Sequence, residues 1–435
     1  MSSQDYSKSF PRLGYGGAQI IKARASYLGT ETLVWDDHLS LLGSAEPYFG
    51  SIHHLKRQLA ETEIYGRGGA AFPLSTKIEA YQRFSGNLVI AANGTESEFL
   101  SRKDAALLTR HPHLVIDGLT ILASSLGAAT GHIHLKYANA AVASVVASAL
   151  AERHGFDPVK IEISISNPSV GYPSGVESAV ISAVDGSGGK PIYLPDRPIE
   201  KGIKRRPTLV SNVETLAQLA LLARFGAKWY SGIGTDAEFG TRLLTITNSD
   251  GRSAVVEVEA GLNVFELLEA LAINLQKTSS VLLGGYFGRL VPPGQVKDLI
   301  ISAPVLKGMG LGLGAGVIAV SSCCPITETS EIIRYLASQS SGQCGPCFNG
   351  LPELALLWDT LSRPGNITTV VDEVNRVCAL VMGRGGCAMP DGAVILSKSS
   401  LRYFESELDI HRQGGCSYSG INSYLVPTDT RKGIR

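Results

Sequence analysis

Charge is scarce in this chain, and neither sign is in surplus. Only 18% of its 435 residues are charged, and 39 Lys and Arg balance 39 Asp and Glu. A nucleic-acid-binding surface usually brings an excess of basic residues, and a solvating tail brings an excess of acidic ones. The composition favours neither class, so no nucleic-acid partner is expected and partners have to be inferred from local motifs.

Long uninterrupted apolar runs are also missing. The first 17 residues contain no apolar core of signal-peptide length. The most apolar stretch, HLVIDGLTILASSLGAATG at 113–131, is interrupted by Asp117 and several small residues. We therefore expect a buried helix there, no direct membrane insertion, and a cytoplasmic protein.

Cysteine is sparse, with seven residues, and without a secretory signal these favour reduced thiols or metal ligands over disulfides. Cys344 and Cys347 form C-x-x-C in SSGQCGPC, and Cys387 follows after a helical stretch. This arrangement suits an iron–sulfur cluster, whereas a zinc site and ordinary buried thiols stay open as alternatives. Extending the pattern to C-x-x-C-x-x-C places the first ligand at Ser341.

The other four cysteines have no comparable spacing partner. Each is expected to be a core or surface thiol, and only the last one, which follows two glycines, is kept as a reserve ligand: Cys323, Cys324, Cys378 and Cys416.

Hydrophobic residues are plentiful, at 44%, and 435 residues suffice for two to four domains. Residues 1–60 form a lead-in without a strong motif, apart from a helix near 54–61. In residues 61–240 short apolar runs such as NLVIAANG alternate with small-residue helical stretches. This alternation predicts an α/β fold with a largely parallel sheet covered by helices.

The rest of the chain changes texture twice. In residues 241–325, two β-like runs flank a turn at Asp250 and Gly251 and precede a helical stretch, which predicts a small α+β module. In residues 326–435 apolar residues recur at helical spacing, and a bundle is the simplest packing. The expected helices cover 326–340, 351–361, 367–382 and 391–411.

Glycine clusters twice. In YGRGGAAFPLSTK, Gly66, Gly68 and Gly69 leave backbone amides uncovered ahead of a helix N-terminus, and these amides can hold a phosphate to which Lys77 adds charge. A tight turn is the alternative. The second cluster, GMGLGLGAG at 308–316, lacks the strand-before, helix-after context of a dinucleotide fingerprint, so it is interpreted as a packing loop beside a strand.

Polar residues follow the apolar runs. Asn93, Glu96 and Glu98 come directly after the predicted strand LVIAA, where the carboxyl ends of parallel strands usually present ligand-binding groups. Glu177 in GYPSGVES and Asn212 in LVSNVETLA stand in similar loop settings. Taken singly, each of them is explained equally well as a helix cap or turn residue.

Taken together and in order, GRGGAAF with its lysine, NGTESE with Lys103 and Asp104 behind it, SGVES, SNVETLA, the hairpin module and CGPC with its distant cysteine resemble one family. It is the NADH-binding, flavin-carrying subunit of respiratory complex I, together with the diaphorase subunits of NAD-dependent hydrogenases and formate dehydrogenases. The resemblance runs from about residue 60 to about residue 410. It implies a Rossmann-like domain for FMN and NADH, then a β-grasp module, then a four-helix bundle with a 4Fe–4S cluster.

The resemblance also implies roles for individual residues. The glycine loop and Lys77 would hold the FMN phosphate and nearby groups, Asn93 would hydrogen-bond the flavin, and Phe72 would stack on the NADH adenine. Glu98 and Glu177 would lie near the nicotinamide nucleotide and position it. The FMN-side residues would be Gly66, Arg67, Gly68, Gly69, Lys77, Asn93, Tyr172, Gly175, Asn212 and Thr215, and the cluster ligands Cys344, Cys347, Cys387 and, in place of the first cysteine, Ser341.

Three positions depart from the family pattern. Thr95 and Val176 replace carboxylates, and the loss of negative charge beside a ribose would relax the preference for NADH over NADPH. Ser341 replaces a cysteine, and a serine alkoxide is a harder and more basic ligand than a thiolate. The cluster is therefore expected to be retained at lower potential, reduced to three irons, or labile.

The function implied is that of an NAD(P)H:acceptor oxidoreductase. Hydride passes from the nicotinamide to FMN without a protein acid or base, and electrons leave singly through the cluster to a ferredoxin-like or other iron–sulfur protein, within a multi-subunit complex. Two alternatives remain. One is a degenerate, non-catalytic structural or regulatory subunit, and the other is a metal- or quinone-binding module, which leaves the first 240 residues unexplained.

Overall fold

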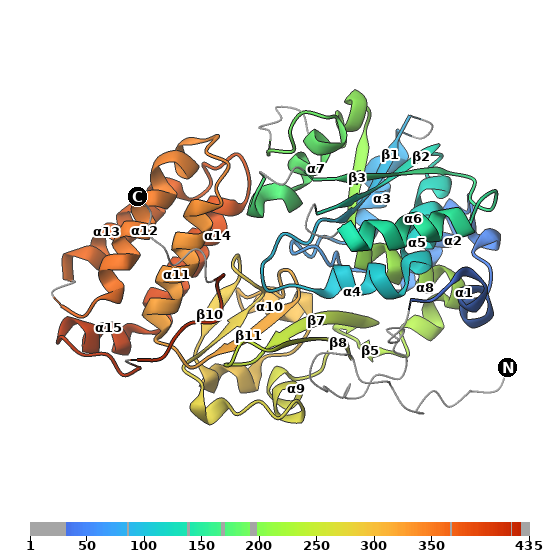
Figure 1. Ribbon diagram of the computed structural model, residues 1–435. Coiled ribbons are helices and arrows are strands. Elements are labelled where there is room, and N and C mark those ends of the chain that lie inside the picture. The colour runs from blue at the N-terminus through green and yellow to red at the C-terminus, as the bar shows by residue number, and fades with distance from the viewer. Residues whose placement is uncertain are drawn as a thin grey trace.

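The computed structural model describes residues 32–84, 87–136, 140–166, 170–191, 198–365, 368–418 and 420–427. The first half of the chain builds a four-stranded parallel sheet in the order β3-β2-β1-β4 (Figure 1). Short apolar runs form its strands, and helices cover it, as the strand and helix alternation predicts. The strands are β1 (Val89–Gly94), β2 (Thr130–Leu135), β3 (Lys160–Ile165) and β4 (Thr208–Asn212).

The helices of this half pack on the sheet and on one another. α5, the apolar stretch, is buried along nearly its whole length, and at Gly118 it meets α8 so closely that a Cβ would lie 1.9 Å from the Leu216 carbonyl oxygen. The helices are α1 (Trp35–Leu42), α2 (Ile52–Glu61), α3 (Leu74–Gln82), α4 (Lys103–Arg110), α5 (Pro112–Ser125), α6 (Ala140–Glu152), α7 (Glu177–Val184) and α8 (Val213–Tyr230), with the 3₁₀ turns η1 (Glu46–Tyr48), η3 (Tyr172–Gly175) and η4 (Ile203–Arg205).

A second, mixed sheet follows in the order β10-β9-β11-β7-β8. Its β7–β8 hairpin turns at Asp250 and Gly251, and α9 follows it, so the predicted hairpin and helix are confirmed. The elements are β5 (Gly234–Thr235) and β6 (Glu238–Phe239), which pair separately, β7 (Thr241–Thr247), β8 (Ser253–Glu259), α9 (Val264–Ala270), η5 (Leu275–Lys277), β9 (Ser280–Leu283), β10 (Arg289–Val291), η6 (Pro293–Asp298), α10 (Ala303–Gly308) and β11 (Val317–Ser321).

The C-terminal region is helical, with η7 (Pro346–Gly350) as a π-turn between its first two helices. The single helix predicted at 391–411 is wrong, because the backbone leaves helical geometry at Phe404 (φ −119°, ψ 31°), whose side chain is buried. The chain turns there, and the last helix packs back on the first two. The helices are α11 (Pro325–Ser338), α12 (Leu351–Ser362), α13 (Thr368–Val381), α14 (Met389–Tyr403) and α15 (Glu405–Arg412).

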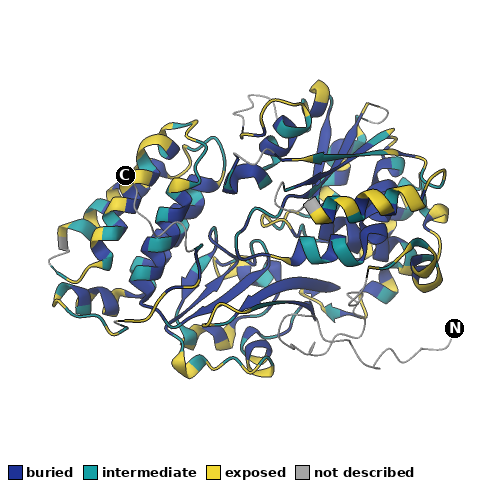
Figure 2. Cartoon of the chain, viewed as in Figure 1, coloured by how far each residue is buried: buried dark blue, intermediate teal, exposed yellow. Residues whose placement is uncertain are grey.

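Burial follows these layers. In Figure 2 the buried residues concentrate on the strands and on the inward faces of the helices, while exposed residues mark the outer helix faces. Within the described ranges no helix has both the length and the apolarity needed to cross a membrane.

Candidate functional site

A cavity of about 730 Å³ opens where the three parts of the fold meet. Its walls come from the glycine loop before α3, the segment after β1, η3, the end of β4, the loop between β9 and β10, the glycine-rich loop before β11, and Ala388. β1 and β4 end side by side, with Asn93 opposite Asn212, so the polar residues that follow these strands reach one edge of the sheet. A cavity of this size suits a cofactor.

The glycine loop forms the base of the cavity because its backbone is fixed at both ends. The Gly66 amide donates to the Phe72 carbonyl at 3.0 Å, and Gly69 has a φ of +112°, which L side chains rarely adopt. A Cβ on Gly68 would lie 3.3 Å from Cβ of Asn212. The loop therefore leaves uncovered backbone next to the cavity and fits the anionic group of a nucleotide or flavin phosphate.

Arg67 and Thr215 fasten this loop. The Arg67 guanidinium is buried against Glu238 and donates to the Thr241 carbonyl at 3.0 Å, while its backbone amide donates to Thr215 Oγ1 at 2.9 Å. Both residues line the cavity, but their polar side-chain atoms are engaged with the protein itself. Their structural contribution is to hold the glycine loop against α8 and β7.

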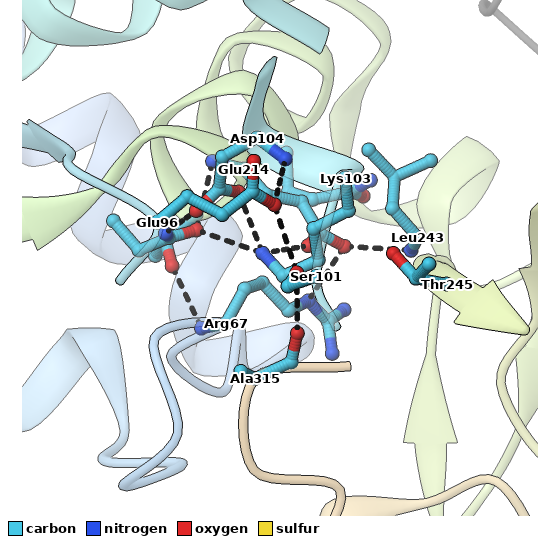
Figure 3. Close-up of polar contacts among 12 residues, drawn as sticks. Arg67, Glu96, Ser101, Lys103, Asp104, Glu214, Leu243, Thr245 and Ala315 are labelled. Atoms are coloured by element: carbon cyan, nitrogen blue, oxygen red, sulfur yellow. Dashed lines mark hydrogen bonds and ion pairs between the residues drawn. The ribbon is translucent and has the colours of Figure 1, made fainter. Parts of the chain in front are cut away.

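A buried ionic network lies beneath the loop. Figure 3 shows Lys103 between two carboxylates, at 2.6 Å from Asp104 and 2.8 Å from Glu214. Asn212 donates to Asp104 at 2.7 Å and accepts from the Glu214 amide at 2.9 Å, which caps α8. Burial raises the pKa of Asp104 to about 7, and the carboxylate of Glu96 adds to the shift while Lys103 opposes it. Cavity-lining residues are thus held in place by a network from three elements.

Glu98 occupies a wall of the cavity and is almost fully buried. It accepts hydrogen bonds from the Tyr172 hydroxyl at 2.5 Å and the Tyr286 amide at 2.8 Å, and burial raises its pKa. A Cβ on Gly285 would lie 2.5 Å from its Oε2, so the glycine is required there. Glu98 and Tyr172 together form a preorganised polar pair beside the cavity.

Other predicted residues differ in how free their side chains are. Asn93 donates to the Gly175 carbonyl at 2.9 Å, and Lys77 donates to the Val210 carbonyl at 2.6 Å and lies 3.5 Å from Glu177. Phe72, by contrast, is 49% exposed, which leaves its ring available for stacking.

The structure brings every residue predicted for FMN or the nicotinamide nucleotide to the lining of this one cavity. They are Gly66, Arg67, Gly68, Gly69, Phe72, Lys77, Asn93, Glu98, Tyr172, Gly175, Glu177, Asn212 and Thr215. Their individual roles stay predictions.

Sequence reasoning missed the opposite wall. The segment expected to be only a packing loop contributes Gly310, Gly312 and Gly314 to the lining, next to Arg289 and Lys307. Gly314 also packs on the glycine loop, through a backbone bridge to Gly69. The clustering of glycines was a usable signal, but a contact between two loops so distant in sequence was not.

The three thiols predicted as ligands lie near one another at one end of the helical region. Cys344 and Cys347 interact directly, and Cys387 is close enough that its charge acts on Cys347 and feels that of Cys344. Burial is the main cause that raises the pKa of Cys347, to about 12, and that of Cys387. Ser341 is half-buried in the same loop, and its hydroxyl has no hydrogen-bond partner within the described part of the chain. The donor set, three thiols and one hydroxyl, fits an iron–sulfur cluster.

This fold and site define a class of protein, a redox subunit with a nucleotide-sized cavity beside an iron–sulfur site. Residues 59–221 match the family described as the Nuo51 FMN-binding domain, and residues 327–411 match the NADH-ubiquinone oxidoreductase-F iron–sulfur binding region. The chain belongs to this family of NADH-oxidising subunits that bind FMN and a 4Fe–4S cluster. The resemblance found in the motifs is thereby confirmed.

Relatives and solved structures agree. An NADH-quinone oxidoreductase subunit of Rhizobium meliloti (strain 1021) is 26% identical over 365 residues, covering 81% of this chain and 87% of the relative. The subunit of the same name in Rickettsia rickettsii (strain Sheila Smith) is 26% identical over 396 residues, covering 86% and 91%. The fold resembles that of an NAD+-reducing NiFe-hydrogenase, with a TM-score of 0.73 at 24% identity over 88% of this chain and 67% of that chain.

Proposed function

We propose that this chain oxidises NADH at bound FMN and passes single electrons, through a cluster held by Cys344, Cys347 and Cys387, to a separate iron–sulfur protein. One observation carries the proposal. The cavity that begins at the glycine loop ends at Ala388, the residue after Cys387, so the flavin site and the cysteine loop share a wall. Electrons leaving the cavity would have a short route to the cluster.

The residues of the chain divide the work of binding and orientation. The uncovered amides of the glycine loop and the charge of Lys77 hold the FMN phosphate, and Asn93 meets the flavin at the end of β1. Phe72 stacks on the adenine of NADH, and Glu98, held by Tyr172, fixes the nicotinamide side. FMN, when bound, supplies the exchange between a two-electron donor and a one-electron acceptor.

The division into domains supports this assignment. We propose residues 61–240 as the Rossmann-like domain, 241–325 as a β-grasp module, and 326–435 as a helical bundle built on α11–α14. The parallel sheet, the mixed sheet crossed by α9, and the helical region support these three units. Within the lead-in at 1–60, the described part packs α2 onto α8, which ties it to the first domain.

The fourth cluster ligand is proposed to be Ser341. Its place in the loop, three residues before Cys344, matches the missing cysteine, and its free hydroxyl is available to iron. An oxygen ligand is harder than sulfur and favours the oxidised cluster, so a lower potential is expected.

The alternative, a degenerate subunit without cofactors, has no observation in its favour. The glycine loop, the ionic network beneath it and the three thiols are all in place.

The test is an anaerobic titration of the purified protein with NADH, followed by visible absorption and iron analysis. We expect a flavin band and a broad iron–sulfur band to bleach together. Ser341→Ala should lose iron on gel filtration, and Ser341→Cys should retain four irons and show a higher potential, whereas Ser340→Ala serves as the neighbouring control. A protein that binds FMN but shows no cluster band in any variant contradicts the electron path, and one without flavin contradicts the function.

A further inference from the structure

A second group of metal-binding side chains lies at the other end of the helical region. Cys324, Glu407, His411 and Cys416 each direct one donor atom to the same point, and all four donor atoms lie within 4.8 Å of one another. The first three side chains are buried, and Cys416 is half-buried. Nothing in the NADH-oxidising site uses them.

The spacing of the donor atoms suits a tetrahedral ion. Zinc at about 2.3 Å from sulfur and about 2.0 Å from nitrogen or oxygen requires edges of about 3.3–3.8 Å between donors. Cys324 Sγ lies 3.4 Å from His411 Nε2 and 4.0 Å from Glu407 Oε1, and His411 Nε2 lies 3.6 Å from that oxygen. Shifts of a few tenths of an ångström would complete the tetrahedron.

The imidazole is oriented as a ligand would be. His411 Nδ1 lies 2.9 Å from the Leu361 carbonyl oxygen, which can only accept, so Nδ1 carries the proton and Nε2 presents its lone pair to the group. Glu407 stands one turn earlier on α15, and the Ser417 amide donates to its Oε1 at 2.9 Å. Metal-ligating histidines commonly donate their other nitrogen to a carbonyl in this way.

This group is separate from the predicted iron–sulfur cluster. Cys324 precedes α11, whereas Cys344 follows its other end, and a helix of 14 residues spans about 21 Å. α15, which carries two of the four donors, lies at the lower end of the helical region in Figure 1. Cys416, kept as a reserve cluster ligand from sequence, belongs to this group instead.

We propose that Cys324, Glu407, His411 and Cys416 form a structural zinc site. Two thiolates, an imidazole and a carboxylate are ligands that zinc prefers, and four protein ligands leave no open position for catalysis. The ion would tie the start of α11 to α15 and to the segment after it.

That segment continues into the core. Ser423 donates to Glu328 at 2.6 Å, and the Tyr286 hydroxyl donates to the Leu425 carbonyl. Because Tyr286 is also the residue whose amide holds Glu98, the zinc site would anchor a C-terminal strap that reaches the wall of the NADH cavity.

The test measures metals in the full-length protein that carries its flavin and cluster. After incubation with one equivalent of zinc and desalting, we expect about one zinc per chain. X-ray absorption at the zinc edge should show two sulfur ligands at about 2.3 Å with nitrogen and oxygen ligands at about 2.0–2.2 Å. This readout needs no variant and is not obscured by iron.

Cys416→Ala removes one ligand from a half-buried position and should lower bound zinc about tenfold or more, with iron and FMN content unchanged. Cys378→Ala, which removes a buried thiol outside both groups, should keep the zinc. Failure of the wild-type protein to retain zinc, or full retention by Cys416→Ala, would show that the four side chains form only a hydrogen-bonded cluster.

Discussion

At the scale of single residues, the two lost carboxylates are not equivalent. Thr95 is fully buried, and its hydroxyl donates to Asn93 Oδ1 at 2.7 Å, so it supports the flavin-side asparagine and does not line the cavity. Val176 does line the cavity, at the turn before α7. The hypothesis of relaxed preference for NADH over NADPH therefore depends on Val176.

Val176→Glu should restore discrimination against NADPH. A carboxylate near the 2′-phosphate repels it by an amount on the order of 1–3 kcal/mol at partly solvated distances, so kcat/KM for NADPH should fall about tenfold or more relative to NADH. Val176→Gln has the same size without the charge and should leave the ratio near that of the wild type. If both variants changed the ratio equally, shape and not charge would set the preference.

At the scale of elements, the loop before β11 shows what glycine does here. Gly314 has a φ of +49°, and a Cβ on it would lie 1.9 Å from the Gly284 carbonyl oxygen. Through its bridge to Gly69 the same residue supports the glycine loop from across the cavity. Two loops far apart in sequence thus depend on one close backbone contact.

Gly314→Ala should weaken FMN binding, because the added methyl group forces the two loops apart. We expect FMN to be lost at least tenfold more readily on dilution, measured by the recovery of flavin fluorescence. Gly308→Ala is the matched control, since a Cβ there meets nothing within 4 Å. Equal FMN retention in both variants would mean that the loop contact does not support the cofactor.

How far sequence carried depended on whether a feature was local. The parallel sheet, the β7–β8 hairpin and α11–α13 follow from periodicity and turn residues, which the sequence displays directly. The break at Phe404 does not, because the pattern stays helical and the turn is set by burial of that ring against the helical region. The partnership of Cys324 with Cys416 likewise exists only after α15 folds back.

At the scale of the whole molecule, the surface beside the cysteine loop is apolar. Phe348, the residue after Cys347, is 71% exposed and Leu356 is 60% exposed, and Leu380 and Met382 at the end of α13 are exposed as well. These side chains belong to η7, α12 and the segment around the end of α13, elements that pack on one another. Exposed apolar groups next to an electron exit suit the docking of the iron–sulfur partner.

Phe348→Ser should therefore slow electron transfer to a protein acceptor without slowing NADH oxidation. Truncating an aromatic anchor commonly costs about 2 kcal/mol or more of binding, so we expect the KM for a two-iron ferredoxin, used as the probe, to rise about tenfold or more. Reduction of ferricyanide by NADH should stay unchanged, because a small acceptor needs no docking surface. Leu41→Ser, at an exposed position on α1, is the control. An equal loss with both acceptors would place the defect in the cluster, whereas no loss with ferredoxin would move the docking surface to another face.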